Sequence, residues 1–328
     1  MRVLGRPFAQ SLCLALLLVL LVPAVPAQEP ITATATDINR ALDLYRSGNI
    51  SQAIEKLTAI TRKRPDDPEA WNILAAVLER EGMIVQARPA LERLVKLRPN
   101  AADVHARLAY ALIQVNECAR AISVAERAVE LGDQSPEAHY AIAEGSLRAG
   151  AFAKALAKAE VALTIKPDFL PAWITKSLAH SALQQYPEAA LSVERLLAIN
   201  PNDIDAETWR GQLEELSLRA TESQSSPSIG GSPIFTGKEV TEKVRVLSKP
   251  EPQFTEPARQ AGVNGTVVLR AAFTADGEVK RVFVMRALGY GLTTQAVKAA
   301  RLIKFNPAIK DGQPVSVFIQ LEYNFNVY

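Results

Sequence analysis

The stretch WNILAAVLEREGMIVQARPALERLVKLRP, from Trp71 to Pro99, decides the architecture of most of the chain. Its apolar residues recur at helical spacing, with Leu74 and Leu78 on the face of a first segment. The small Ala87 allows a second helix to approach the first closely, and Pro99 ends that second helix. The stretch therefore predicts a hairpin of two helices.

The same hairpin recurs with a period of 34 residues. The small residue of the second helix returns as Ala53, Ala87, Ala121, Ala155 and Ala189. The terminating prolines keep this spacing as Pro65 and Pro99 and as Pro167 and Pro201, with Asp133 in the place between them. A fixed period of this length indicates stacked helical hairpins. We predict five of them over residues 34–203.

These units resemble tetratricopeptide repeats. The resemblance implies an all-α superhelix whose concave groove, lined by the first helix of each hairpin, binds a peptide or a partner helix. A role restricted to spacing and dimerisation is equally compatible with such a stack. The residues expected to line the groove are Asn72, Arg107, Tyr110, Tyr140, Glu144 and Arg148.

Two short segments follow the repeats. Residues 204–221 carry Trp209, Leu213 and Leu216 at helical steps, which predicts a capping helix over the last open repeat. Residues 222–237 are rich in Ser, Pro and Gly and poor in charge, so we expect a flexible linker there.

From Lys238 onward the apolar period changes from that of a helix to that of a strand. Residues 265–273 and 278–286 alternate around an Asp276-Gly277 turn and predict a β-hairpin. A short helix over 292–303 follows, and residues 315–325 alternate again as a last strand.

Residues 238–328 resemble the TonB C-terminal domain. The resemblance rests on Pro252-Gln-Phe254-Thr-Glu-Pro257-Ala258-Arg259, Gly262, Gly265, Asp276-Gly277, Phe305-Asn-Pro307-Ala308 and Asp311-Gly312-x-Pro314-Val315. It implies a small periplasmic α+β domain with an antiparallel sheet, whose edge receives a strand from a partner. The expected pairing residues are Val315, Ser316, Val317, Phe318, Ile319, Gln320, Leu321, Glu322 and Tyr323.

The N-terminal residues 1–27 have the features of a secretory signal peptide. Arg2 and Arg6 precede an uninterrupted apolar run from Ser11 to Val22, and Val25-Pro-Ala27 offers small residues before a cut. The run is short for a span of the membrane, which takes roughly 20 residues. An uncleaved leader that anchors the chain in the inner membrane is the alternative.

The composition further restricts the classes of function that fit the chain. Residues 238–328 hold 13 Lys and Arg against 8 Asp and Glu, so the repeats carry the compensating negative charge once the leader is removed. This polarity favours attraction between the halves or toward different partners, and it is too mild for nucleic-acid binding. Cys118 is the single cysteine after the leader and forms no internal disulfide.

The sequence contains no catalytic or metal-binding pattern. No carboxylate or lysine stands in a motif with a nucleophile, a base and an orienting group. His105 and His139 occupy the same repeat position, and His180 lies on another first helix, so repeat packing explains them better than a metal site does. We therefore expect a protein that is not an enzyme and that takes no cofactor, metal or small-molecule substrate.

The sequence thus predicts a multidomain protein, with an all-α tetratricopeptide superhelix followed by a small α+β domain. The function it favours is a periplasmic adaptor: the groove binds one protein, and the C-terminal domain binds an outer-membrane receptor or another envelope protein. The alternative is a membrane-anchored energy transducer for transport through the outer membrane. The mass of the mature protein separates the two, because an adaptor whose leader has been removed begins at Gln28.

Overall fold

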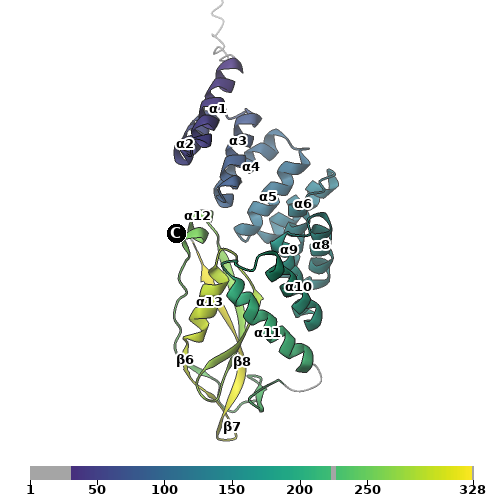
Figure 1. The fold of residues 1–328 in the computed structure, drawn as a ribbon, viewed down its shortest axis with the longest axis vertical. Coiled ribbons are helices and arrows are strands. Elements are labelled where there is room, and N and C mark those ends of the chain that lie inside the picture. The colour runs from purple at the N-terminus through teal and green to yellow at the C-terminus, as the bar shows by residue number, and fades with distance from the viewer. Residues whose placement is uncertain (1–30, 223–226, 327–328) are drawn as a thin grey trace, which may run out of the picture.

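The computed structural model describes residues 31–222 and 227–326. A stack of helices comes first, and a smaller domain with a twisted sheet lies along its lower half (Figure 1). The predicted signal peptide lies outside the described residues. The helices of the stack are α1 (Ile31–Arg46), α2 (Ile50–Lys63), α3 (Pro68–Arg80), α4 (Ile84–Leu97), α5 (Ala102–Gln114), α6 (Cys118–Glu130), α7 (Pro136–Arg148), α8 (Phe152–Ile165), α9 (Leu170–Ala182), α10 (Tyr186–Ile199) and α11 (Ala206–Glu222).

Successive hairpins are joined by a repeated hydrogen bond. At one repeat position, a ring nitrogen of the first helix meets the carbonyl oxygen of the proline six residues earlier. The pairs are Trp71 with Pro65 at 2.9 Å, His105 with Pro99 at 3.0 Å and Trp173 with Pro167 at 2.8 Å. His105 therefore holds a junction between hairpins, which is the structural role that its spacing indicated.

The C-terminal domain contains both strands and helices. Its elements are β1 (Ser228–Ile229), β2 (Ser232–Phe235), β3 (Arg245–Ser248), α12 (Glu256–Ala261), β4 (Gly265–Phe273), β5 (Val279–Arg286), α13 (Leu292–Arg301), β6 (Lys304–Asn306), β7 (Ala308–Lys310) and β8 (Gln313–Phe325). The main sheet has the order β1-β2-β8-β4-β5, with β7 paired to β8, and β3 and β6 form a separate ribbon. Strands β4, β5, β7 and β8 pair antiparallel, whereas β2 runs parallel to β8.

The alternation of β4 and β8 divides the sheet into two faces. Leu269 and Phe273 of β4 and Leu321 of β8 are buried in the domain's own core. Phe273 also lies against Phe305 of β6, with ring centroids 4.6 Å apart. The other face, which includes Val268 and Arg270, is turned toward the repeats.

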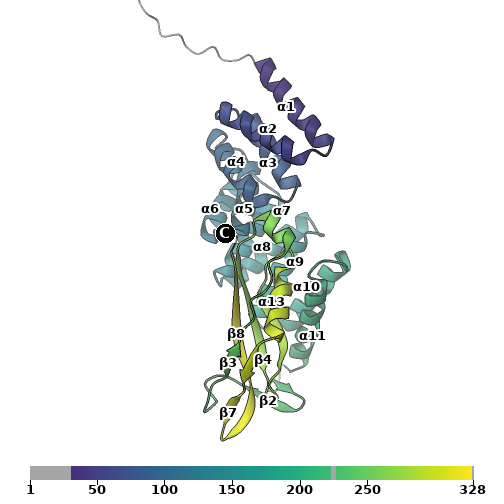
Figure 2. The same ribbon diagram turned by 90° about the vertical axis from the view of Figure 1, so that its left-hand side faces the viewer.

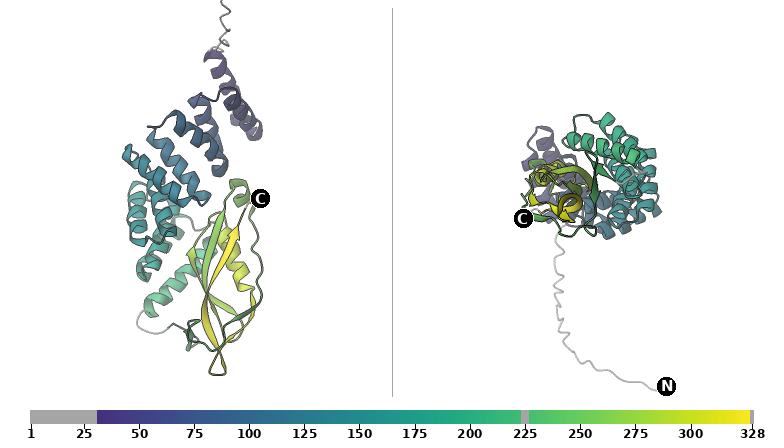
Figure 3. Two further views of the ribbon diagram at one scale, coloured as in Figure 1. Left: turned by 180° about the vertical axis from the view of Figure 1, so that it is seen from behind. Right: turned by 90° about the horizontal axis from the view of Figure 1, so that it is seen from below.

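The repeats and the C-terminal domain share one core. Leu178 of α9 and Leu216 of α11 belong to the same buried cluster as Phe273 and Tyr323 of the sheet, whereas Leu91 of α4 belongs to a separate cluster within the repeats. Figure 2 shows the domain lying against α7 to α11, and Figure 3 shows the helices curving along one side of it. The predicted fold class, a helical repeat stack followed by an α+β domain, is confirmed.

Candidate functional site

The outer edge of β8 is the first candidate site. One edge of β8 pairs with β4 along its length, from Val317 opposite Phe273 to Phe325 opposite Gly265. The other edge pairs with β7 as far as Val315 and with β2 at Ser316 and Val317. Within residues 31–222 and 227–326, no strand pairs with that edge beyond Val317. The outward backbone groups of residues 318–325 are therefore not paired with another strand of the described chain, and Glu322 O alone accepts a hydrogen bond from a side chain, that of Lys249.

The strand β2 shows how this edge accepts an added segment. Ile234 pairs with Ser316 and Phe235 with Val317, both in parallel orientation. Residues 227–237, where the sequence predicts a flexible linker, thus contain a short strand on β8. The chain leaves the edge after Phe235, so the remainder of the edge continues in line with β2.

The direction of the edge groups follows from one contact. Lys249 Nζ donates a hydrogen bond to the backbone oxygen of Glu322 at 2.8 Å, so that carbonyl points away from β4. Because residues two apart in a strand direct their backbone groups to the same side, Phe318 and Gln320 present their N–H and C=O groups at the same edge. The side chains of Gln320 and Glu322 are exposed.

The expected groove residues fall into two groups. The first lies between α3 and α5, where Arg107 bonds to Asn72 Oδ1 at 2.8 Å and to both carboxylate oxygens of Glu79. Each partner of the Arg107–Glu79 ion pair is 23% exposed. This contact ties two hairpins together on the concave side.

The second group lies deeper, between α5, α7 and α9. The rings of Tyr110 and Tyr140 contact each other in a tilted arrangement, with centroids 5.7 Å apart. Arg148 Nε bonds to Glu144 Oε1 at 2.7 Å, and Thr175 donates to the other oxygen of Glu144 at 2.8 Å. Burial raises the pKa of both tyrosine hydroxyls, which therefore stay protonated at neutral pH.

This second group faces the C-terminal domain. A cavity of about 140 Å³ is lined on the repeat side by Tyr110, Tyr140, Glu144 and Arg148, and on the other side by Val263 and residues 287–290. The loop before α13 thus closes this part of the groove. The sequence predicted two separate binding sites, one in the groove and one on the C-terminal domain. In the structure, residues of both parts line the same cavity.

The helix α11 forms the main polar contact between repeats and domain. Asp205, just before it, accepts hydrogen bonds from Gly291 N at 3.1 Å and from Thr294 N at 3.2 Å, at the start of α13. The Thr294 hydroxyl adds a bond of 2.6 Å to the same carboxylate. Asp205 therefore caps a helix 86 residues further along the chain. Burial raises the pKa of the Asp205 carboxyl, and these hydrogen bonds offset part of the rise.

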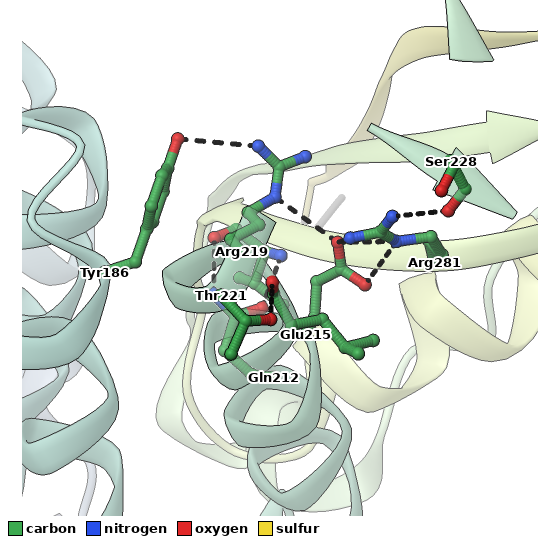
Figure 4. Close-up of polar contacts among 9 residues, drawn as sticks. Tyr186, Gln212, Glu215, Arg219, Thr221, Ser228 and Arg281 are labelled. Carbon is green, nitrogen blue, oxygen red and sulfur yellow. Dashed lines mark hydrogen bonds and ion pairs between the residues drawn. The ribbon is translucent and has the colours of Figure 1, made fainter. Parts of the chain in front are cut away.

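Further along α11, polar side chains meet β5. Gln212 Oε1 accepts from Val284 N at 2.8 Å, which satisfies a backbone group at the edge of the sheet. Glu215 pairs with Arg281, whose Nε lies 3.0 Å from each carboxylate oxygen, and Arg219 bonds to the same carboxylate at 3.3 Å (Figure 4). Glu215 is 5% exposed and Arg281 is 9% exposed, so this pair lies inside the interface.

This polar face of α11 was not predicted from the sequence. The adjacent face, where Trp209 and Leu216 are buried, was predicted as a cap on the repeats. The signal was present, because Asp205, Thr208, Gln212, Glu215 and Arg219 recur every three or four residues. A regular polar stripe is also typical of a solvent-exposed face, so only the structure assigns it to an interface.

The described residues hold no group of three or more His, Cys, Asp or Glu side chains placed to bind a metal ion. Within that same part of the chain, no helix has the length and apolar character needed to cross a membrane.

Comparison with known families identifies the two parts of the chain. Two models described as tetratricopeptide repeat match residues 38–102 and 78–145. A model described as Gram-negative bacterial TonB protein C-terminal matches residues 250–327. The chain thus carries tetratricopeptide repeats followed by a TonB C-terminal domain, as the sequence predicted. Both domain types are generally non-catalytic modules of protein interaction, and the second indicates association with the cell envelope.

Solved structures with a similar fold include three repeat proteins. The MamA protein is 22% identical, with 53% of this chain and 94% of that chain covered and a TM-score of 0.44. YrrB, described as a TPR protein with an unusual peptide-binding site, is 17% identical over 53% of this chain and 90% of that chain, with a TM-score of 0.42. PilW, a type IV pilus biogenesis factor, is 16% identical over 60% of this chain and 96% of that chain, with a TM-score of 0.45. No curated protein matches the chain.

Proposed function

We propose that this chain is a periplasmic adaptor between proteins of the cell envelope. Its C-terminal domain binds an outer-membrane receptor or another envelope protein by accepting a strand at the outer edge of β8, and its repeats bind a second protein. The observation that carries this proposal is the edge of residues 318–325, which continues beyond the pairing of β2 with Ser316 and Val317.

Main-chain pairing suits an adaptor of this kind. Backbone hydrogen bonds supply affinity for many sequences, while side chains at alternate positions set the preference. The exposed side chains of Gln320 and Glu322 lie where they can make that selection. The parallel pairing of β2 supports a partner strand that runs in the same direction as β8.

The repeats also retain an open part of their groove. A hollow of about 600 Å³ lies between α1 and α3 and is lined by Leu42, Tyr45, Ile73 and Arg80 among others. The C-terminal domain does not line it. This hollow supports the binding of a second protein by the first two hairpins.

The test is to replace Gln320 with proline. Proline removes the outward N–H group that a partner strand needs, and this group does not bond to β4. The matched control is Gln320→Ala, which removes the side chain and keeps the N–H group. We expect Gln320→Pro to abolish capture of the envelope partner, and Gln320→Ala to retain it.

Both variants are compared with the unaltered chain by circular dichroism and thermal unfolding, so that loss of capture is not confused with loss of the fold. Phe318→Pro provides a second test at the same edge. Capture that is unchanged in both proline variants would contradict strand addition at β8.

A further inference from the structure

A second cavity lies between the repeats and the outer face of the sheet. It has a volume of about 250 Å³, and we call it the inter-domain cleft. Its lining on the repeat side includes Leu147, Arg148 and Phe152, and on the sheet side it includes Met285 and Arg286. The cleft lies over the face of the sheet and reaches the side chains of Gln320 and Glu322, whose backbone groups belong to the edge of β8.

The strand register places charges along the sheet side of the cleft. Val268 of β4 lies opposite Arg286 of β5 on one side and opposite Glu322 of β8 on the other. Directly opposed residues share one face of a sheet, so Arg286 and Glu322 flank Val268. Neighbouring strands are about 4.8 Å apart, so the backbones at Arg286 and Glu322 lie about 10 Å apart. No ion pair joins these two side chains.

Arg286 differs from the other arginines at this interface. Arg148 is paired with Glu144, and Arg219 and Arg281 share Glu215. Within the part of the chain that the structure describes, the Arg286 side chain has no carboxylate partner and no hydrogen-bond partner. Its cation therefore lies at the wall of the cleft without compensation, and an anion placed there would gain a charge-assisted hydrogen bond.

A second arginine adds to the positive charge of this face. Arg270 lies two residues beyond Val268, on the same face of β4. Its guanidinium lies over the ring of Phe318, 4.5 Å from the ring centroid. It forms no ion pair with any described residue. The pKa of Arg270 is lowered, chiefly by burial and then by the neighbouring Arg219.

The remaining walls of the cleft are mostly apolar, with Gln320 and Glu322 of β8 as their polar members. Leu147, Phe152, Val268 and Met285 surround the space beside Arg286. A ligand that fits therefore combines a carboxylate with apolar groups. The volume of about 250 Å³ falls below the usual range for the pocket of a small-molecule ligand, which begins near 300 Å³. Side chains of a protein segment suit this space better.

We propose that the inter-domain cleft binds an acidic segment of a partner protein, in which a carboxylate pairs with Arg286 and adjacent apolar side chains contact Phe152 and Met285. This inference rests on the proposed function, since it specifies the chemistry of a protein that the adaptor holds. In this proposal the repeats and the C-terminal domain form the binding surface together, because Arg286 lies on β5.

The experiment uses the full chain and two fluorescein-labelled peptides. In the first peptide of twelve residues, Asp alternates with Leu and Phe, and in the second Asn replaces each Asp. Fluorescence anisotropy is measured at 50 mM and 500 mM NaCl. We expect the acidic peptide to bind and the Asn peptide to bind at least tenfold more weakly, with the difference reduced at high salt, where charges are screened over about 4 Å.

Two charge reversals on the same domain locate the site. Arg286→Glu is expected to weaken binding of the acidic peptide by about tenfold or more, which corresponds to about 1.4 kcal/mol. Arg245→Glu makes the same change in net charge on β3, where Arg245 is exposed and does not line the cleft, and it is expected to leave binding unchanged. Arg286→Gln, which keeps a polar side chain, is expected to lose most of the same affinity.

Three outcomes would overturn the inference: no binding of the acidic peptide, equal binding of the Asn peptide, or equal loss in Arg286→Glu and Arg245→Glu. The result is separable from the test of the proposed function. Capture of the envelope partner that persists in Gln320→Pro contradicts strand addition whatever the peptide does, whereas a failure of the peptide test leaves strand addition standing.

Discussion

The first two hairpins and the last two hairpins of the stack are built from the same 34-residue unit, yet they have different neighbours. Leu57 and Leu91 are buried by other repeat residues. Leu178 and Leu196 are buried in a cluster that includes the apolar core of the C-terminal domain. The period of a repeat therefore determines the inside of each hairpin, but it does not determine what covers the concave face.

Polar contacts differ between the two regions in the same way. Near the N-terminal end, Arg93 pairs with Asp66, whose side chain is 84% exposed. At the C-terminal end, Glu215 is 5% exposed and holds two arginines. Surface pairs contribute about 0 to 1 kcal/mol, whereas breaking a buried pair leaves an uncompensated charge and costs about 3 to 5 kcal/mol. Substitutions in these ion pairs can therefore measure how much the contribution of polar contacts to stability differs between the two regions.

The largest effect is expected for Glu215→Ala. Removing this carboxylate leaves Arg281 and Arg219 buried without their shared partner, at a cost of about 3 to 5 kcal/mol. Unfolding in urea, followed by tryptophan fluorescence, measures the loss. Trp209 reports on α11, which lies in this interface.

The matched control is Glu126→Ala on the surface of the repeats. Glu126 pairs with Lys154, and both side chains are nearly half exposed. Its loss is expected to cost less than about 1 kcal/mol. Equal losses in Glu126→Ala and Glu215→Ala would remove the distinction between surface ion pairs of the repeats and the buried pairs of the interface.

The next effect concerns the contact between α12 and α4. Gly262 has a φ of 67°, and a Cβ atom added there would lie 2.9 Å from Val85 Cβ of the second hairpin. Gly277 has a φ of 84° with open space around it. Both substitutions to alanine incur the backbone strain of the left-handed region, and only Gly262→Ala adds a steric clash.

We expect Gly262→Ala to cost about 1 to 3 kcal/mol more than Gly277→Ala, from overpacking against Val85. Chemical denaturation of both variants gives the difference. If the two variants are equally stable, the stability of the C-terminal domain does not depend on its contact with the early repeats. The early and late repeats would then differ more clearly in how they contribute to that domain.

Asp205 gives a prediction about pH. Its pKa in the folded chain is raised, chiefly by burial, so the folded state binds the proton more tightly than the unfolded state does. The resulting stabilisation is fully present below the ordinary pKa of about 3.9 and is lost as the pH rises through the raised value. Asn caps a helix about as well as Asp and does not titrate.

The expected result is that the unaltered chain gains stability relative to Asp205→Asn as the pH is lowered from 7 toward 4. Thermal unfolding of both proteins at several pH values in this range measures the difference. A difference that stays constant with pH would show that the Asp205 carboxyl does not bind protons differently in the folded state.

The longer elements of both domains could be predicted from the sequence, because local patterns determine them. The hairpin of residues 265–273 and 278–286 coincides closely with β4 and β5, since alternation and the Asp276-Gly277 turn are local signals. The 34-residue period likewise places ten helices of the stack.

The docking of the two domains could not be predicted in this way. It depends on pairs such as Asp205 with Thr294 and Glu215 with Arg281, which are separated by 66 to 89 residues and share no motif. The short strand β2 was missed for a related reason. Ser232 to Phe235 is a strand because β1 and β8 pair with it, and its own composition is that of a linker.

The smallest effect is expected at Arg107, in the early part of the groove. Arg107→Ala removes its bonds to Glu79 and Asn72, but water can reach the 23% exposed partner and compensate for part of the loss. We expect a cost of about 1 kcal/mol in urea unfolding, well below that of Glu215→Ala. A cost as large as that of Glu215→Ala would mean that the early hairpins rely on their polar contacts as strongly as the interface does. Since their apolar residues are buried by the repeats alone, we expect packing to carry most of their stability.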